Sequence, residues 1–178
     1  EMCIRDRDHI GHPEAKIRDE LVFSSLARGL QDDLFSAEQV RFLAQEAVKR
    51  QGLFYMSDKN GQATLTRSFT ALLYANLLNC DGNPNSSYYQ ALSVQGRKYL
   101  LDKGLTYLSV ERDTRGYSRK YGWVHAFAHG ADLLTEVACH PDFPSSRMPE
   151  VLEIIHQVFK RVPVRFRNDE DWRLSQVL

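Results

Sequence analysis

The sequence predicts an all-α protein with a single domain. Apolar residues recur every three to four positions through most of its 178 residues, and no stretch alternates convincingly with a period of two. Serine caps, glycines and prolines separate these periodic segments at short intervals. We therefore expect seven to eight helices in antiparallel pairs, stacked as a HEAT-like right-handed superhelix in preference to a closed four-helix bundle.

Three helices are expected in the first half of the chain. The first occupies residues 13–29, where apolar side chains follow the helical period. A second begins after Ser36, because Gln39 three residues later completes a capping box, and it ends near Gln51. The third, at residues 64–79, is the most apolar.

The remaining helices are expected in the second half of the chain, where turn-forming residues again separate them. They are residues 88–101, capped by Ser86 or Ser87 and continued to Gly104; a short segment that ends before Asp113; residues 121–139; residues 148–161; and a last piece from residue 168.

Residues 11–178 form the expected domain, whereas residues 1–10 do not join the helical pattern. The start lacks the apolar stretch of a signal peptide, so we expect no targeting segment there. The string MCIRDR at residues 2–7 resembles a translated adapter sequence, which predicts a non-native or disordered start.

The composition excludes several classes of protein. The 23 Lys and Arg balance the 23 Asp and Glu, so we expect no bulk nucleic-acid binding, and a charged ligand must meet a local patch. No apolar run approaches the roughly 18 residues of a membrane span. The three widely spaced cysteines, Cys3, Cys80 and Cys139, suggest neither a disulfide scaffold nor a thiolate zinc site, which favours a cytoplasmic protein.

A polar stripe in residues 121–139 carries the first candidate chemistry. His125, His129 and Asp132 follow the spacing i, i+4, i+7, which places them on one face of the expected helix. They could ligate a divalent metal, act as a general base with its orienting acid, or hydrogen-bond a ligand, and the spacing does not choose among these. A structural role for satisfied histidines is the alternative. Because residue 126 is Ala, the HExxH motif is absent, and we expect no metal.

The arginine-rich loop, residues 111–120, precedes this stripe. Guanidinium groups such as those of Arg115 and Arg119 bind phosphate or carboxylate through two parallel hydrogen bonds. The neighbouring Tyr121 and Trp123 could stack on a base or a sugar. A solvated loop without a ligand is the alternative.

Arg67 and Tyr74 share a stripe of the third helix. If that helix faces the one with the histidines, both side chains could complete a polar pocket. Arg67 could equally pair with an acid.

Several strings carry a family resemblance: GWVHAFAHGADLL at residues 122–134, IRDELVFSSLARGL at residues 17–30 and RSFTALLYANLL at residues 67–78. They resemble a bacterial family described as domain of unknown function 2785, over about residues 11–178. The resemblance implies a helical, HEAT-like domain and brings no activity or cofactor. The positions that match the family pattern are Arg67, Trp123, His125, His129 and Asp132.

The sequence favours a non-enzymatic protein that captures a small anionic ligand, such as a signalling nucleotide in a virus–host conflict. The ligand would lie in a groove between the arginine-rich loop and the histidine stripe, with no cofactor, and a homo-oligomer stays open. Two alternatives are a metal- or histidine-dependent hydrolase of a phosphorylated substrate and a protein-interaction solenoid. The expected ligand-binding residues are Arg67, Tyr74, Arg115, Arg119, Tyr121, Trp123, His125, His129 and Asp132.

Overall fold

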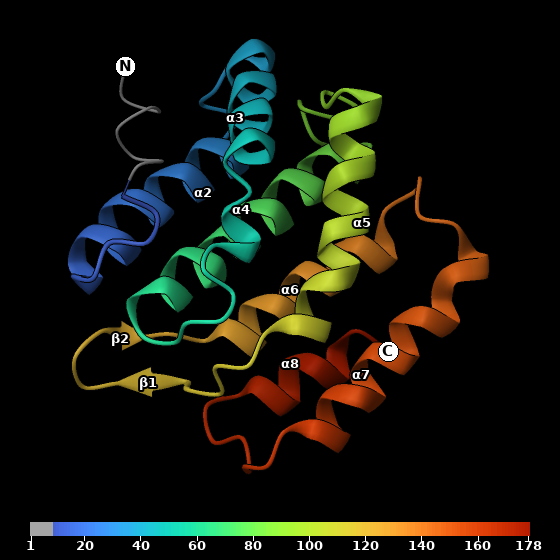
Figure 1. Cartoon of the computed structure of the whole chain (residues 1–178). Helices are drawn as coiled ribbons and strands as arrows, with labels where there is room; N and C mark the ends of the chain where they lie inside the picture. The colour runs from blue at the N-terminus through green and yellow to red at the C-terminus, as the bar shows by residue number, and fades with distance from the viewer. Residues whose placement is uncertain (1–8) are drawn as a thin grey trace.

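The computed structural model describes residues 9–178, which fold around the long helix α4 (Figure 1). Helices hold 65% of the chain and the strands are two residues long, which confirms the all-α prediction. The elements of the described chain are the π-helix η1 (Lys16–Phe23), α2 (Ser24–Gln31), α3 (Ala37–Arg50), the 3-10 turn η2 (Gly52–Phe54), α4 (Gln62–Gly82), α5 (Val94–Val110), β1 (Tyr117–Ser118), β2 (Gly122–Trp123), α6 (Ala126–Cys139), the 3-10 turn η3 (Ser145–Arg147), α7 (Met148–Arg161) and α8 (Glu170–Gln176).

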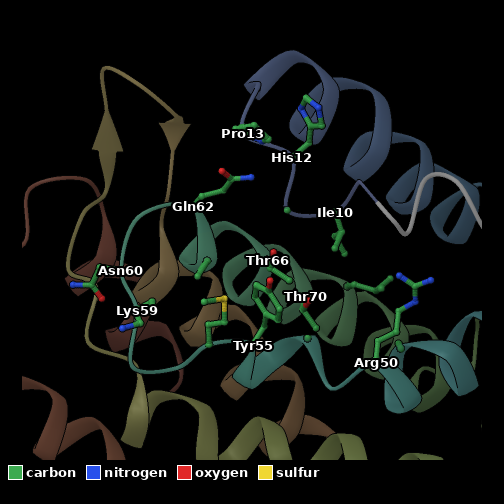
Figure 2. A pocket seen from close by; sticks show the side chains of 16 residues that line it. Ile10, His12, Pro13, Arg50, Tyr55, Lys59, Asn60, Gln62, Thr66 and Thr70 are labelled. Atoms are coloured by element: carbon green, nitrogen blue, oxygen red, sulfur yellow. The ribbon is translucent and has the colours of Figure 1, made fainter.

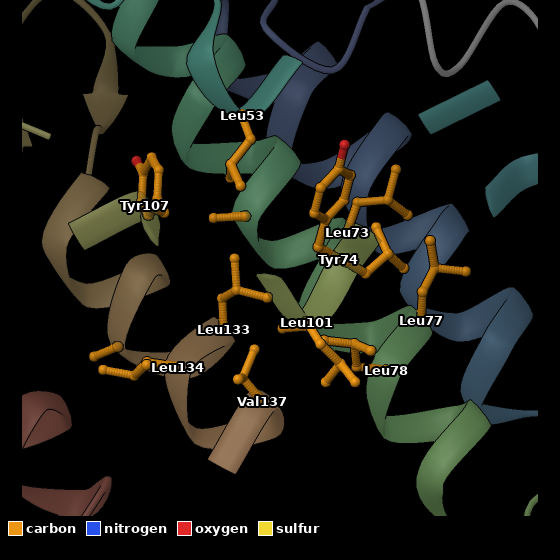
Figure 3. Close-up of a cluster of buried hydrophobic side chains, with 14 of the residues drawn as sticks. Leu53, Leu73, Tyr74, Leu77, Leu78, Leu101, Tyr107, Leu133, Leu134 and Val137 are labelled. Carbon is orange, nitrogen blue, oxygen red and sulfur yellow. The ribbon is translucent and has the colours of Figure 1, made fainter. Parts of the chain in front are cut away.

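Helix α4 lies at the centre because it is apolar around most of its circumference. Leu73 and Leu77 of α4 belong to one buried cluster with Leu133 and Val137 of α6 (Figure 3). Each such side chain contributes about 1.5–3 kcal/mol when it is fully buried. The packing of α4 against α6 therefore helps to position the segment that directly precedes α6.

Helices with strong local signals begin and end where the sequence predicts. Ser36 caps α3, and its hydroxyl accepts a hydrogen bond from the Gln39 amide at 3.1 Å while the Gln39 side chain accepts one from the Ser36 amide at 2.7 Å. This is the predicted capping box. The predicted helix at residues 148–161 coincides with α7.

The helix expected at residues 88–101 begins later, at Val94. Its N-cap is Ser93, whose hydroxyl accepts the backbone amide three residues on at 3.1 Å, and the prediction of Ser86 or Ser87 as the cap was wrong.

Contacts that are distant in sequence shift this boundary. The buried carboxylate of Asp81 accepts a hydrogen bond from the Leu92 amide at 2.8 Å and pairs with Arg97. These two contacts hold the residues before α5 in turns. Gly104 does not end the helix, because α5 continues to Val110. A Cβ atom at Gly104 would lie 2.7 Å from Val137 Cγ2, so the glycine allows α5 to approach α6 closely.

The helix expected at residues 121–139 also begins later, at Ala126. The residues before it form an antiparallel hairpin in which Tyr117 lies opposite Trp123. His125 is the N-cap residue and has the left-handed conformation, with φ at 45°.

Two distant groups hold this segment out of the helix. The Gly116 carbonyl accepts the amides of Val124 and His125 at 2.8 and 3.2 Å. Arg18 of η1 donates from Nη2 to the Tyr121 carbonyl at 2.8 Å. A helical segment would offer neither group in this position.

The two ends of the chain differ in part from expectation. The predicted first helix, residues 13–29, corresponds to η1 followed by α2, and the last helix begins at Glu170 and not at residue 168. Of the segment expected to be non-native or disordered, residues 1–8 lie outside the described part, and Ile10 is buried. Among residues 9–178, no helix has both the length and the apolar character needed to cross a bilayer.

Candidate functional site

His129 lies in the first turn of α6 and faces α4. Its Nδ1 atom lies 2.8 Å from the hydroxyl of Ser68, which donates its own proton to the Val124 carbonyl. Nδ1 is therefore the donor in the imidazole–hydroxyl bond, since the hydroxyl proton is already used. Phe69 packs edge-on against the imidazole, with ring centroids 5.1 Å apart.

His125 is the second imidazole of this cluster. Its ring lies 5.6 Å from that of His129 and 4.4 Å from the indole of Trp123, centroid to centroid. Its buried Nε2 atom has no hydrogen-bond partner among the described residues. Burial and the nearby charge of Arg173 lower the pKa of His125 to about 4, so the imidazole is neutral at pH 7.

Asp132, the third residue of the predicted stripe, is held by an ion pair with α8. Its carboxylate pairs with Arg173 of α8, and burial raises its pKa above the ordinary value. Because His125 precedes the helix instead of lying in it, the expected single stripe does not form. The described residues contain no cluster of three or more side chains that could hold a metal ion.

The arginine-rich loop is partly consumed by the fold. Arg115 binds the buried carboxylate of Asp113, with Nε at 2.8 Å from Oδ1, and reaches the Gly61 carbonyl. Arg119 and Lys120 are exposed at the tip of the hairpin, and the Lys120 ammonium lies 4.8 Å from the centre of the Tyr121 ring. Of these three cations, Arg119 and Lys120 are exposed, whereas Arg115 is half-buried and paired.

Arg67 and Tyr74 do not join a ligand pocket in this structure. Arg67 is buried, and its guanidinium donates to both carboxylate oxygens of Glu111 at 2.8 and 2.9 Å and to three backbone carbonyls of the segment before α4. The Tyr74 hydroxyl donates to the Ala47 carbonyl at 2.9 Å. Both side chains therefore stabilise the fold, and of the two readings of Arg67 the structure favours the pairing with an acid.

Sequence reasoning missed Arg18. This guanidinium is fully buried, lies 4.7 Å from the centre of the Phe69 ring and binds the carbonyls of His12, Tyr121 and Trp123. Two of these carbonyls lie about a hundred residues away. Its acidic partner among the described residues, Asp19, is the adjacent residue, with Oδ1 2.7 Å from Arg18 Nε, so no side-chain pattern signals the contact with the hairpin. The π-helix around it was equally absent from the prediction; such helices are frequent at functional sites.

A cavity of about 780 Å³ lies between the start of the described chain, the end of α3 with η2, and the first half of α4 (Figure 2). We call it the N-terminal cavity. None of the predicted site residues lines it. The lining from α4 includes Thr66 and Thr70, one turn apart on one face, whereas Ser68 lies between them on the opposite face.

The charged side chains among the described lining residues are cationic. Arg50 and Lys59 supply cations at two ends of the cavity, and His12 adds an imidazole (Figure 2). The described residues that line it include no aspartate or glutamate. Neither cation is without a partner: Arg50 takes part in a further interaction, and Lys59 pairs with Asp58 at 3.4 Å. The Lys59 and Asp58 side chains are exposed, and such exposed pairs contribute about 0–1 kcal/mol.

The comparisons with known proteins give a family without an assigned activity. The family model described as "Protein of unknown function (DUF2785)" matches residues 53–178. No curated protein and no solved structure matches the chain. The matched range contains the hairpin, the histidine cluster and the α4 side of the N-terminal cavity, while the cavity's remaining walls precede it.

Proposed function

We propose that this chain, which belongs to the DUF2785 family because the family model matches most of its length, binds a small anionic ligand without catalysing a reaction. One observation carries the proposal: the N-terminal cavity, of about 780 Å³, has two cationic side chains and no acidic one among its described lining residues. The proposal keeps the ligand class that the sequence suggests, a nucleotide or similar phosphate, and moves the site from the expected groove to this cavity.

The size of the cavity fits a small molecule. Ligand pockets typically measure about 300–1,000 Å³ and combine apolar walls with a few placed polar groups. Here Ile10, Met56 and Leu73 contribute apolar surface, and the amides of Asn60 and Gln62 lie at the rim (Figure 2). A mononucleotide or sugar phosphate has matching polar and apolar parts.

The cavity floor supplies hydroxyl groups with spare hydrogen-bonding capacity. Thr70 is only 5% exposed, and its hydroxyl makes no hydrogen bond with the described residues. A Cβ atom at Gly52 would lie 2.6 Å from this hydroxyl oxygen, so a larger residue at position 52 would clash with the Thr70 side chain. A ligand oxygen that accepts a hydrogen bond from this hydroxyl gains about 1 kcal/mol, the net contribution of one neutral hydrogen bond.

The cations explain the preference for an anion. Hydrogen bonds from guanidinium or ammonium groups to phosphate are about twice as strong as neutral ones. The described residues that line the cavity include no carboxylate, so an incoming phosphate is attracted by Arg50 and Lys59 and is not repelled by those lining residues. The carboxylate of Asp58, beside Lys59, is exposed and screened by solvent.

The other readings of the sequence lack a comparable observation. A hydrolase would need a nucleophile or an acid–base pair in the cavity, where His12 is the one imidazole among the described lining residues. The interaction solenoid would need the HEAT-like right-handed superhelix, which stays a prediction.

Isothermal titration calorimetry with adenosine monophosphate and uncharged adenosine tests the proposal. We expect adenosine monophosphate to bind at least about tenfold more tightly, since one charged hydrogen bond contributes about 1.5–3 kcal/mol. Arg50→Gln and Lys59→Gln should each weaken binding of the phosphate about tenfold and leave the binding of adenosine unchanged.

Arg165→Gln and Lys160→Gln are the matched controls, because both cations are exposed and lie outside the cavity. Equal affinity for the two probes would contradict the proposal. A loss of phosphate binding in Arg119→Gln, with none in the cavity variants, would return the site to the hairpin and overturn the cavity assignment.

A further inference from the structure

We infer that the hairpin of residues 117–123 is a docking platform for a short single-stranded segment of nucleic acid. Its sequence, YSRKYGW, holds three aromatic and two cationic side chains and no acidic one. The inference is independent of the N-terminal cavity, because no hairpin residue lines that cavity.

The aromatic side chains are open to a partner. Tyr117 is 56% exposed and Trp123 is 45% exposed, and their rings pair edge-to-face across the two strands with centroids 5.1 Å apart. Stacking of a base on such a ring contributes about 1–3 kcal/mol and does not depend strongly on which base is bound.

Contacts with other parts of the fold hold the platform in place. The Trp123 indole lies beside the ring of His125, with centroids 4.4 Å apart, and the Trp123 carbonyl accepts a hydrogen bond from the buried Arg18 at 3.2 Å. The carbonyl of Gly116 accepts hydrogen bonds from the amides of Val124 and His125, the two residues after Trp123. An exposed aromatic that is already fixed loses little conformational entropy when it binds, which is the advantage of preorganisation.

The cations lie where a sugar–phosphate backbone would pass. Arg119 and Lys120 occupy the turn between the two aromatic strands, and both are exposed. The structure gives Arg119 no ion pair with the described residues, whereas Arg115 at the base of the loop is already held by Asp113. Phosphate contacts position a strand, and the rings then stack on its bases.

The chemistry of the hairpin favours nucleic acid over a lipid surface. Amphipathic membrane-binding segments bury aliphatic side chains beside their aromatic ones, and YSRKYGW has no aliphatic side chain. The overall charge of zero argues against coating of long duplexes, so the platform fits a segment of only a few nucleotides.

The intrinsic fluorescence of Trp123 provides the test. The chain has two tryptophans, and Trp172→Phe leaves Trp123 as the only reporter. In this background we expect a ten-residue oligothymidylate or oligouridylate to quench the emission, with an affinity that falls as salt rises. Tyr117→Leu should weaken binding at least about fivefold through lost stacking. The double change Arg119→Gln with Lys120→Gln should reduce the slope of log affinity against log salt by about one to two.

Lys160→Gln with Arg165→Gln is the matched control and should leave both affinity and slope unchanged. The inference is overturned if the oligonucleotides cause no quenching, or if a mononucleotide or a duplex of equal length binds as tightly. Quenching by vesicles of anionic lipid without quenching by oligonucleotide would also overturn it.

Discussion

On one face of α4, the hydroxyls of Thr64 and Ser68 are bound to the segment that links α5 to α6; on the opposite face, Thr66 and Thr70 border the N-terminal cavity. Thr64 donates to Asp113 at 2.6 Å, while the Thr70 hydroxyl makes no hydrogen bond with the described residues. We call the first side, with its neighbours Arg67 and His129, the network face. The difference teaches that residue type does not distinguish the two faces, whereas unused hydrogen-bonding capacity does.

The largest expected effect is on the network face. Arg67→Ala would leave the buried carboxylate of Glu111 without its cation and three carbonyls without the donor they share, and breaking a buried pair in this way costs about 3–5 kcal/mol. Urea denaturation followed by circular dichroism measures the loss. The exposed pair of Arg28 with Asp32 provides the control, since Arg28→Ala should cost less than about 1 kcal/mol. Equal losses in the two variants would remove the distinction between saturated and exposed cations.

The second effect comes from the neutral histidines beside the network face. An unfolded histidine has a pKa of about 6.5, whereas the buried His125 has a pKa of about 4. The unfolded chain therefore takes up a proton first as the pH falls, so the stability that is present above pH 6.5 decreases down to about pH 4, by about 3 kcal/mol. Burial lowers the pKa of His129 as well, which adds a loss of the same sign.

Denaturation series between pH 7.5 and 4.5 measure this dependence. His125→Asn removes one imidazole and keeps a residue type that tolerates the left-handed conformation. The variant should show a shallower decrease with pH than the parent chain. An unchanged slope would assign the pH dependence to other groups.

Local sequence signals predicted part of this molecule well. The capping box of Ser36 and Gln39 and the periodicity of residues 148–161 depend on neighbours within one or two turns, and both helices were confirmed. The starts of α5 and α6 depend on Asp81, Gly116 and Arg18, which are distant in sequence, and both were predicted wrongly.

The candidate site divides in the same way. The spacing of His125 and His129 correctly placed two imidazoles together, although through a cap and a helix and not along one stripe. The buried partner of Arg67 lies 44 residues away, and spacing cannot choose it. The N-terminal cavity combines residues from separate segments that share no motif, so it becomes visible only after folding.

A smaller effect tests the network face without removing a charge. Ser68→Ala deletes the hydroxyl that joins the Val124 carbonyl to His129 Nδ1 and leaves both groups buried. The expected cost is about 1–3 kcal/mol, the range for unsatisfied buried polar groups, measured by the same denaturation method. A loss below about 0.5 kcal/mol would mean that these groups find other partners.

The smallest effect on stability belongs to the cavity face and completes the comparison. Thr70→Val replaces the hydroxyl with a methyl group of similar size; because that hydroxyl makes no hydrogen bond with the described residues, we expect the free energy of unfolding to change by less than about 0.5 kcal/mol. Binding of adenosine monophosphate should nevertheless weaken about fivefold, since one neutral hydrogen bond contributes about 1 kcal/mol. Ser68→Ala is the matched comparison, with a loss of stability and no loss of binding by the folded protein. A different result would contradict this comparison: Thr70→Val would destabilise the chain as much as Ser68→Ala and leave binding unchanged. Both faces of α4 would then be structural, and the proposed ligand site in the cavity would be wrong.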